Sequence, residues 1–430
     1  MSVDDALAVT VLHGDLSLLL AKTVGRQRSL FQDDVEQNAS AIRSAINGKR
    51  ILVTGAAGSI GSSTIRQLVK YGPALLAAVD ISENNLVELV RDLRGQLDTD
   101  IGDTLKTYAV DFGSALGDRF INDVGPFDLV LHFAAMKHVR SERDVYSLSR
   151  LIETNVLKVD HFLSTLKLTS SCDVFAISTD KACAPANLMG ASKRLMEQVV
   201  LWHGLNGGAL AGNEGSTSPA LPRVACTRFA NVAFSEGSLL SGFLSRIQKR
   251  QPLAGPSDVR RYFITEDEAG QICLLTAALA DSGQIFVPRL DPDADLKTFD
   301  RIAEIVLQYC GFKPAWYRSD ADAKKNMAAD LGKGLYPCCF APSDTSGEKE
   351  FEEFVGPGET VLASAFTSID VIGQTPQIDA SVLRAAIKGL TKVTAAPDPH
   401  TAKRQIVELL ATAVPNLQHI EKDRDLDQKM

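Results

Sequence analysis

At 430 residues the chain is long enough for one large domain or for two, and its 45% hydrophobic and 23% charged residues are typical of a folded globular protein. The formal net charge of -8 at pH 7 argues against a general nucleic-acid-binding surface, which would be basic. The acidic N-terminal stretch lacks the basic, apolar start of a signal peptide, and no run approaches the roughly 18 apolar residues of a membrane span. We therefore expect a cytoplasmic protein without a membrane-spanning segment.

Apolar, β-rich runs alternate with helical patterns through the first half of the chain. Nearly continuous apolar runs between helices indicate strands that are buried on both faces, as in a parallel sheet built from strand–helix–strand units. The pattern predicts an α/β fold with a Rossmann-type doubly wound parallel sheet, followed by a smaller C-terminal lobe. The expected strands are 51–54, 75–79, 107–110, 128–132, 173–178 and 224–228, and the expected helices are 60–70, 83–97, 150–168 and 189–204.

The first expected strand runs directly into the sequence GAAGSIG, which contains Gly55, Gly58 and Gly61 and precedes a helix. Glycines here let the backbone approach a pyrophosphate, whose negative charge the N-terminus of the following helix favours. The second strand ends in Asp80, whose carboxylate can accept hydrogen bonds from a ribose hydroxyl and would repel a 2′-phosphate. The loop predicts a dinucleotide site that prefers NAD to NADP, although its GxxGxxG spacing also fits glycines that only make tight turns.

Further candidate residues follow the third and fourth strands. Asp111 comes after the third strand and either hydrogen-bonds the adenine or caps a turn. After the fourth strand, the small Ala134 and Ala135 let the backbone press against a cofactor. Lys137 and His138 lie just beyond and are candidate substrate contacts, with a structural role as the alternative for the histidine.

The fifth strand ends in Thr179, Asp180 and Lys181, at the carboxyl edge of the sheet where an α/β protein places its site. A helix that begins near Met189 brings Lys193 onto the same face one turn later, through its i, i+4 spacing. We expect these polar side chains to converge beside the nicotinamide, and the alternative is a solvated turn. The predicted cofactor-binding residues are Gly55, Gly58, Ser59, Ile60, Gly61, Asp80, Asp111, Ala134, Ala135 and Lys193.

Several sequence blocks carry a family resemblance. GAAGSIG, HFAAMKHV, STDKACAPANLMGASKR, RFANV, RYFIT and GEKEFEE occur in the order seen in extended short-chain dehydrogenase/reductases. More narrowly, residues 24–355 resemble the bacterial polysaccharide-biosynthesis UDP-N-acetylglucosamine 4,6-dehydratases, and the third block is the most specific. The resemblance implies NAD as cofactor and a UDP-sugar as substrate. Many members carry membrane helices ahead of this unit, and we expect the chain to lack them.

The resemblance also implies the catalytic roles. Met189 stands where most relatives have a tyrosine, and one branch, which is thought to retain the configuration at C5, itself has methionine there. Because methionine has no titratable proton, the proton of the sugar O4 leaves through Thr179, a water or Lys193. NAD+ takes hydride from C4, Lys181 is the base at C5, Asp180 protonates the departing C6 hydroxyl, and hydride returns to C6. These roles need a neutral Lys181 and a protonated Asp180, which burial favours and an ion pair between the two opposes.

The match weakens in the second half of the chain. Asn231 is kept and can hydrogen-bond the sugar diphosphate, but Glu236 and Thr345 stand where relatives often have arginine. Arg260 and Arg261 are the best remaining cations, with a plain surface charge as the alternative. The predicted substrate-binding residues are Lys137, His138, Asn231, Arg260, Arg261 and Glu348.

The expected domain organisation follows from these blocks. It comprises a helical lead-in at 1–48, an NAD-binding Rossmann domain at 49–231 with a flexible insertion at 206–222, a substrate-binding lobe at 232–392, and a C-terminal helix with a charged tail at 393–430. None of the seven cysteines forms a CxxC pair, so the sequence predicts no metal site. Relatives often associate through helices beside the active-site strand, so we expect a homodimer or larger homo-oligomer that uses the helices at 150–168 and 189–204.

These observations predict an NAD-dependent nucleotide-sugar 4,6-dehydratase, a lyase that converts UDP-N-acetylglucosamine or a close NDP-hexose to a 4-keto-6-deoxy sugar with C5 retained. Such a product would serve surface polysaccharide or glycan biosynthesis. Two alternatives stay open. A nucleotide-sugar 4-epimerase uses the same fold and NAD but returns hydride to C4, and it normally needs the tyrosine that is missing here. A catalytically silent nucleotide-sugar-binding protein is suggested by Glu236 and Thr345.

Overall fold

The computed structural model describes residues 16–96, 102–166, 172–206, 222–343, 349–374 and 378–419. The chain divides into two compact units, each assembled from segments that are far apart in the sequence. Unit 1 takes its described residues from Met1–Leu30, Ala230–Glu268 and Leu290–Glu352. Unit 2 takes its described residues from Phe31–Phe229, Ala269–Arg289 and Glu353–Met430.

Unit 2 is built on a 9-stranded sheet in the order β15-β16-β11-β6-β5-β4-β1-β2-β3. The strands from β11 to β3 are parallel, while β16 pairs with both β11 and β15 in the antiparallel sense. The order β3-β2-β1-β4-β5-β6 is that of the doubly wound Rossmann sheet, so the predicted α/β fold is confirmed. The strands are β1 (Arg50–Thr54), β2 (Leu75–Asp80), β3 (Leu105–Ala109), β4 (Leu129–His132), β5 (Asp173–Ile177), β6 (Val224–Thr227), β11 (Ile285–Pro288), β15 (Thr360–Leu362) and β16 (Ile369–Gln374).

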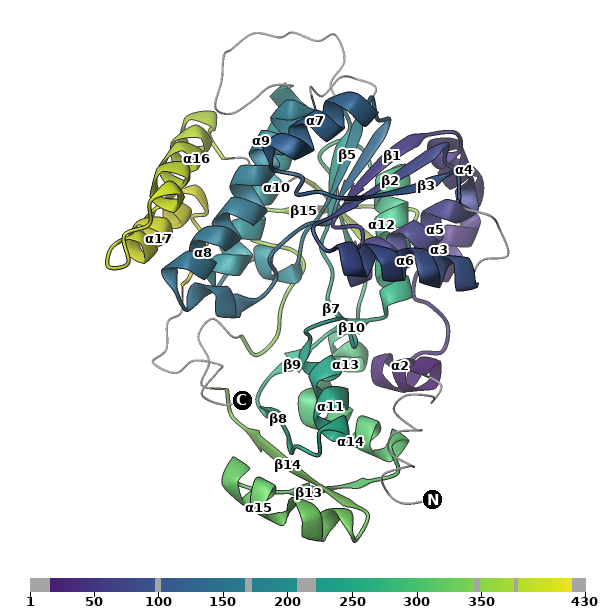
Figure 1. The fold of residues 1–430 in the computed structure, drawn as a ribbon, viewed down its shortest axis with the longest axis vertical. Helices are drawn as coiled ribbons and strands as arrows, with labels where there is room; N and C mark the ends of the chain where they lie inside the picture. The colour runs from purple at the N-terminus through teal and green to yellow at the C-terminus, as the bar shows by residue number, and fades with distance from the viewer. Residues whose placement is uncertain are drawn as a thin grey trace. The chain divides into compact units, whose positions relative to one another are not determined.

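Helices cover both faces of this sheet, with α7 to α10 on one side and α5, α6 and α12 on the other (Figure 1). Central strands such as β1 and β4 are therefore almost entirely buried, as their continuous apolar sequences predicted. The helices here are α3 (Gln32–Gln37), α4 (Ala39–Ile46), α5 (Ser59–Leu68), α6 (Glu83–Gln96), α7 (Ala115–Val124), α8 (Val145–Ile152), α9 (Lys158–Thr165), α10 (Leu188–Asn206) and α12 (Glu266–Leu279), with short turns η1 (Val69–Tyr71), η2 (Val139–Glu142) and η4 (Asp180–Ala182).

The helix expected at 150–168 is interrupted. A π-helical turn, η3 (Glu153–Leu157), joins α8 to α9. Asn155 lies within this wider turn, and its side chain points into the interior. Its Oδ1 accepts a hydrogen bond from the Met136 backbone N–H, and its Nδ2 donates one to the Met136 carbonyl oxygen. The π-helical turn thus coincides with hydrogen bonds between Asn155 and a residue outside the helix, and the helical periodicity of the sequence does not predict such bonds.

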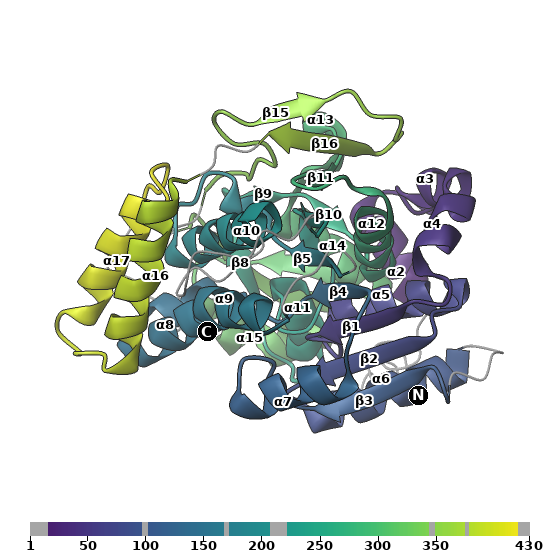
Figure 2. The same ribbon diagram turned by 90° about the horizontal axis from the view of Figure 1, so that it is seen from above.

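A C-terminal hairpin of α16 (Ala380–Ala395) and α17 (Ala402–Ala413) packs against α8, η3 and α10, as Figures 1 and 2 show from two directions. Its buried side chains, among them Leu383, Leu390 and Leu410, belong to the same apolar core as the parallel sheet. The hairpin therefore covers part of the helix surface that we expected to serve association between subunits. The homo-oligomer stays a prediction, but this surface is in part already occupied.

Unit 1 is smaller and has its own apolar core, with Phe243, Ile302 and Tyr336 fully buried. A parallel three-stranded sheet pairs β13 (Lys313–Trp316), β14 (Leu335–Ala341) and β8 (Leu253–Pro256). Two-stranded pairs join β7 (Asn231–Val232) to β10 (Phe263–Ile264) and β9 (Arg260–Arg261) to β12 (Lys297–Thr298). The helices are α2 (Leu16–Val24), α11 (Leu239–Gln248), α13 (Pro292–Asp295), α14 (Phe299–Tyr309) and α15 (Asp320–Leu331).

The two units do not follow the contiguous boundaries expected at residues 48, 231 and 392. The lead-in is shared, because residues up to 30 belong to unit 1 and residues from 31 belong to unit 2. The segment from 353 onward returns to unit 2, since β16 hydrogen-bonds to β11 and the C-terminal hairpin packs on the sheet's helices. Residues 207–221, which make up nearly all of the expected insertion, lie outside the described residues. None of the described helices has the length and apolar character needed to cross a membrane.

Candidate active site

The glycine loop follows β1 in a conformation that other residues could not easily adopt. Gly55 has φ +69, and a Cβ atom built on it would lie 2.5 Å from the Ala134 backbone nitrogen. A Cβ atom on Gly61 would lie 2.3 Å from the Gly55 carbonyl oxygen. The loop therefore packs tightly against the start of α5 and against the segment after β4, and glycine is needed at both positions. The helix α5 begins directly after this loop, with Gly58 as N-cap and Ser59 and Ile60 in its first turn, and pyrophosphate binding at this N-terminus stays a prediction.

Asp80 ends β2 and contacts this loop directly. Its Oδ2 accepts a hydrogen bond from the Ala57 backbone N–H at 3.1 Å, and its Oδ1 accepts one from the Ser82 N–H at 2.9 Å. The carboxylate therefore lies beside the glycine loop, as a ribose-binding carboxylate should, while it also stabilises the loop itself.

Asp111 has a structural partner. Its side chain accepts hydrogen bonds from Lys158 and from the Gly113 backbone N–H. Burial opposes ionisation of this carboxyl, but the hydrogen bond and charge of Lys158 outweigh it and lower the pKa of Asp111. These contacts favour the turn-capping alternative over adenine recognition, which stays a prediction.

The segment after β4 places Ala134 half-buried beside Gly55, and Ala135, Lys137 and His138 at the surface of unit 2. Partial burial, together with the charges of Lys137 and Arg140, lowers the pKa of His138. An exposed neutral imidazole next to a lysine fits the proposed substrate contact, because both can donate hydrogen bonds to a sugar or phosphate.

The residues predicted to be catalytic, Thr179, Asp180 and Lys181, follow β5 and form one hydrogen-bonded group, which we call the catalytic turn after that prediction. Asp180 Oδ1 accepts bonds from Thr179 Oγ1 at 2.7 Å, from the Lys181 backbone N–H at 2.8 Å and from Lys181 Nζ at 3.0 Å. Asp180 is 2% exposed, whereas the Lys181 side chain is 19% exposed. The ion pair that sequence reasoning gave as the opposing possibility is therefore present.

Lys193 and Met189 lie on α10, close to the same sheet edge. Lys193 Nζ donates a hydrogen bond to the Ile177 carbonyl oxygen at 2.6 Å, so the ammonium group reaches the end of β5 as predicted. Burial lowers the pKa of Lys193 to about 8. Met189 is 4% exposed and belongs to the apolar core. The structure thus brings Lys193 to the catalytic turn's strand and places an apolar side chain where relatives have a phenol.

Two buried residues that sequence reasoning missed support this region. Asn155 donates to Ser192 Oγ at 3.0 Å in addition to its bonds with Met136, and so ties η3 to α10. Glu142 Oε1 accepts bonds from the Leu188 and Met189 backbone N–H groups at 2.6 and 3.1 Å. A carboxylate at the N-terminus of a helix satisfies free N–H groups and favours the helix dipole. For Asn155 the available sequence signal was a polar side chain within an expected helix, and for Glu142 there was none.

Arg228, the first residue after β6, is at the centre of a buried ion cluster. Its guanidinium donates to Glu197 at 2.8 Å, to Glu359 at 2.7 Å and to the Phe354 carbonyl oxygen at 2.9 Å. Arg194 adds ion pairs to the same two glutamates. We call these four residues, Arg194, Glu197, Arg228 and Glu359, the buried charge network. It connects α10 to β6 and to the segment after residue 353.

The predicted substrate-binding residues of unit 1 have protein partners. Arg261 is 5% exposed and donates to the carbonyl oxygens of Arg260, Lys349 and Glu350. Arg260 pairs with Glu350 at 2.9 Å. The Asn231 side chain donates to the Tyr262 carbonyl oxygen at 3.4 Å. Arg261 is therefore a backbone-binding side chain rather than a plain surface charge, and Glu348 lies outside the described residues.

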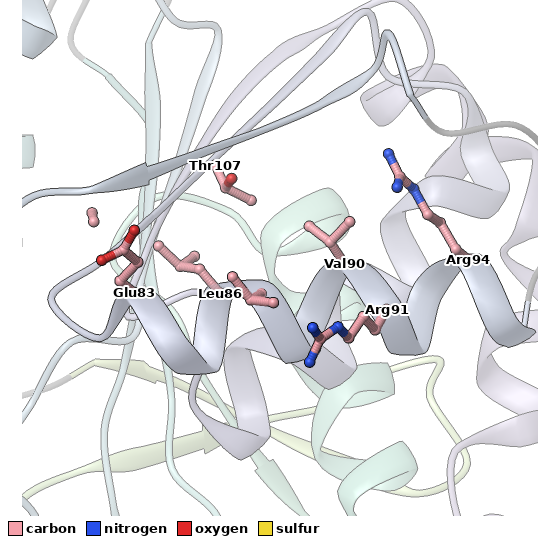
Figure 3. Close-up of a pocket in the computed structure, with 8 residues that line it drawn as sticks. Glu83, Leu86, Val90, Arg91, Arg94 and Thr107 are labelled. Carbon is pink, nitrogen blue, oxygen red and sulfur yellow. The ribbon is translucent and has the colours of Figure 1, made fainter.

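A cavity of about 430 Å³ lies along α6 and β3 of unit 2 (Figure 3). Thr107 of the strand lies across from Leu86 and Val90 of the helix, while Glu83, Arg91 and Arg94 supply charges. None of the predicted site residues lines this cavity. It is therefore a feature of the sheet edge and not of the catalytic turn.

The profile of the polysaccharide biosynthesis protein family matches residues 51–370, most of the chain. The chain belongs to this family. Among similar proteins, the capsular polysaccharide biosynthesis protein CapD of Staphylococcus aureus is 31% identical in sequence to this chain. The alignment spans 314 residues, which is 70% of this chain and 48% of CapD. The inverting UDP-N-acetylglucosamine 4,6-dehydratase of Campylobacter jejuni serotype O:23/36 is 28% identical over 259 residues, or 57% of this chain and 68% of that enzyme.

The family assignment agrees with the fold. The crystal structure of Pen from Bacillus thuringiensis superposes with a TM-score of 0.60 at 20% identity, covering 80% of this chain and 98% of Pen. At that identity the match bears on the fold alone. The chain spans about half the length of CapD, so what CapD does as a whole is not transferred to it.

Proposed function

We propose that the protein is an NAD-dependent nucleotide-sugar 4,6-dehydratase that acts on UDP-N-acetylglucosamine or a close NDP-hexose. The observation that carries this proposal is the catalytic turn: an acid, a base and a hydroxyl hydrogen-bonded to one another at the end of β5, with Lys193 bonded to the last residue of the same strand. An oxidoreductase that only moved hydride would not need the Asp180–Lys181 pair. A dehydratase needs an acid for the leaving hydroxyl and a base for the neighbouring carbon.

The residues of unit 2 fit NAD. The cradle formed by Gly55 and Gly61 has no room for side chains, which is what close approach of a pyrophosphate requires. Asp80 would accept hydrogen bonds from the adenosine ribose and repel a 2′-phosphate. When bound there, NAD+ would supply the hydride chemistry, accepting hydride from C4 of the sugar and giving it back at C6.

The ion pair of the catalytic turn is, in this proposal, the resting form of the acid and base. A sugar that covers the turn removes water and raises the cost of keeping two charges. The proton on Lys181 Nζ can then pass to Asp180 Oδ1 along the existing 3.0 Å hydrogen bond. The neutral amine takes the C5 proton and later returns it, while the carboxylic acid protonates the C6 hydroxyl, which leaves as water. The proton released from O4 is held by another acceptor until Asp180 has protonated the C6 hydroxyl, and it then replaces the proton that Asp180 has given.

The proton at O4 needs an acceptor other than position 189. Thr179 Oγ1 can accept it and relay a proton to a water, and it can pass a proton to Asp180 Oδ1, 2.7 Å away, only after Asp180 has protonated the C6 hydroxyl. Lys193 is a second acceptor, because burial lowers its pKa to about 8 and makes the neutral amine accessible. The similar Campylobacter enzyme is named as inverting. In this chain, Met189 stands where most relatives have tyrosine, and the family resemblance then supports retention of the configuration at C5.

Incubation of the purified protein with UDP-N-acetylglucosamine, followed by mass spectrometry and NMR, tests the proposal. We expect a product that has lost one water, with a C4 ketone and a C6 methyl group, and with solvent deuterium at C5. A product of unchanged mass would instead indicate a 4-epimerase. Binding without turnover across UDP-, GDP-, CDP- and dTDP-sugars would indicate a silent binding protein and would contradict the proposal.

A further inference from the structure

The chain does not end at the hairpin that covers α8 and α10. The residues that follow α17, Val414–His419, run back over the loop that connects the catalytic turn to α10. We call them the C-terminal strap. Their contacts are hydrogen bonds to residues more than two hundred positions earlier in the chain, all within unit 2.

Two bonds hold the loop backbone. Asn416 Nδ2 donates to the Cys183 carbonyl oxygen at 2.8 Å. The Gln418 backbone N–H donates to the Pro185 carbonyl oxygen at 2.9 Å. Cys183 follows the catalytic turn by two residues, and Pro185 lies midway to Met189. The strap therefore satisfies backbone carbonyls in the segment that joins Lys181 to α10.

A third contact reaches the start of α10. His419 Nε2 lies 3.3 Å from Glu142 Oε2, and the other oxygen of Glu142 accepts the Leu188 and Met189 N–H groups. The Glu142 and His419 side chains are 11% and 14% exposed. The carboxylate thus lies between the strap and the first turn of the helix that carries Lys193.

The strap begins at a fixed point. Leu410, Ala413 and Val414 are buried in the core of unit 2, and α17 packs against α10. The hairpin and strap also lie beyond residue 370, where the family match ends.

We propose that the C-terminal strap is a positioning element for the active site: Asn416 and His419, the latter through Glu142, hold the 183–189 loop so that the catalytic turn and Lys193 keep their relative placement. The inference rests on the proposed function for its effect on turnover. Its effect on the loop does not depend on what the protein catalyses. Asn416, His419 and Glu142 act through the backbone and are positioning residues, not groups that touch the sugar.

The test uses the full-length protein and the variants Asn416→Ala and His419→Ala, singly and together, with His400→Ala as the matched control. His400 is exposed in the α16–α17 connection, and the only bond that its backbone is seen to make is to Asp398. Hydrogen–deuterium exchange of peptides covering 183–189 is measured first. A hydrogen bond contributes about 0.5–1.5 kcal/mol, so each variant should speed exchange in this loop by about 2- to 13-fold, and the control should not.

Turnover gives the second readout. We expect kcat to fall by a similar factor while KM, NAD content and the unfolding temperature change little, because the strap lies outside the sugar and cofactor contacts. His419→Gln keeps a hydrogen-bond donor and should restore most of kcat. Unchanged exchange at 183–189 in the double variant would overturn the proposal, and so would faster exchange with unchanged kcat. If the wild-type protein has no dehydratase activity, the proposed function fails while the exchange result still decides whether the strap holds the loop.

Discussion

The buried charge network and the catalytic turn are both clusters of acids and bases in unit 2, yet they are built in opposite ways. In the network, the guanidinium of Arg228 has five N–H groups and makes five hydrogen bonds, four to carboxylate oxygens and one to a carbonyl. In the turn, the three hydrogen bonds that the Asp180 carboxylate accepts from Thr179 and Lys181 converge on one of its oxygens, Oδ1. The first cluster is saturated, and the second keeps capacity for a substrate.

The difference separates charges that stabilise the fold from charges that can change. Burial raises the pKa of Glu197, but Arg228 and Arg194 outweigh it and hold that pKa at about 2, so the network stays ionised across the physiological range. The Lys181 side chain is 19% exposed and pairs with a single carboxylate, so its environment changes when a ligand displaces water. We therefore interpret the saturated network as structural and the turn as the cluster that can take part in chemistry.

The largest expected effect is on turnover in the catalytic turn. Lys181→Ala should lower kcat about 10²- to 10⁴-fold and abolish deuterium exchange at C5, because it removes the base while leaving the NAD site intact. Asp180→Asn should block water loss but still allow some C4 oxidation, seen as transient NADH absorbance. Lys392→Ala, on the exposed side of α16, is the control and should retain full activity. If Lys181→Ala kept nearly the wild-type kcat, the base would lie elsewhere, and the catalytic turn would no longer differ in role from the buried charge network.

The network should respond in stability rather than in chemistry. Arg228→Met leaves Glu197 and Glu359 buried without their main partner, and breaking a buried ion pair costs about 3–5 kcal/mol of unfolding free energy. Arg91→Ala removes an exposed pair with Glu88 on α6 and should cost about 0–1 kcal/mol. Urea denaturation of both variants measures the contrast. If both variants lost the same free energy of unfolding, burial of the network would not make its ion pairs more stabilising than an exposed pair.

Lys193 lies between these two extremes, since it is buried and its ammonium group donates to the Ile177 carbonyl oxygen and to the Met196 sulfur. Its pKa of about 8 is below the usual value near 10.5, so the side chain is protonated below pH 8 and neutral above it. If the neutral amine accepts the O4 proton, kcat/KM should rise about tenfold per pH unit up to pH 8 and then level off. Lys193→Arg keeps a cation and should lose this limb of the pH profile. A flat profile in the wild-type protein would favour Thr179 as the acceptor.

Met189→Leu is the mildest change in the series. The side chain is buried in the apolar core, and a swap that conserves volume usually costs less than about 1.5 kcal/mol. We expect kcat to stay within a few-fold of the wild-type value. An effect as large as that of Lys181→Ala would mean that the thioether itself takes part in the reaction.

The parts of the site that lie on single elements were predictable from the sequence. The apolar strands, the glycine loop and the polar residues at the end of β5 follow from local periodicity and from the rule that sites lie at the carboxyl edge of a parallel sheet. Glu142, by contrast, caps α10 from 46 residues away, and Asn416 bonds Cys183 from 233 residues away. Those contacts depend on tertiary packing, which spacing along the chain does not encode.

The same limit applies in the second half of the chain. Arg261 was predicted to be a substrate-binding cation or a surface charge; its guanidinium donates to the carbonyl oxygens of Arg260, Lys349 and Glu350, and a role in substrate binding stays a prediction. The units also interleave, because β11 and β16 come from late segments that complete a sheet begun at residue 50. Neither feature leaves a periodic signal in the sequence.

That interleaving means that the cofactor-binding half is not a detachable module. A fragment that stopped at Phe229 would contain the glycine loop and the catalytic turn, yet β6 would lack its neighbour β11. All residues of β6 are buried, so the fragment would present an apolar strand edge with unpaired backbone groups. Such edges pair with other chains, and the expected fate of the fragment is aggregation. A gene that duplicated or exchanged this half would have to carry the late segments with it, which limits how such proteins can be recombined.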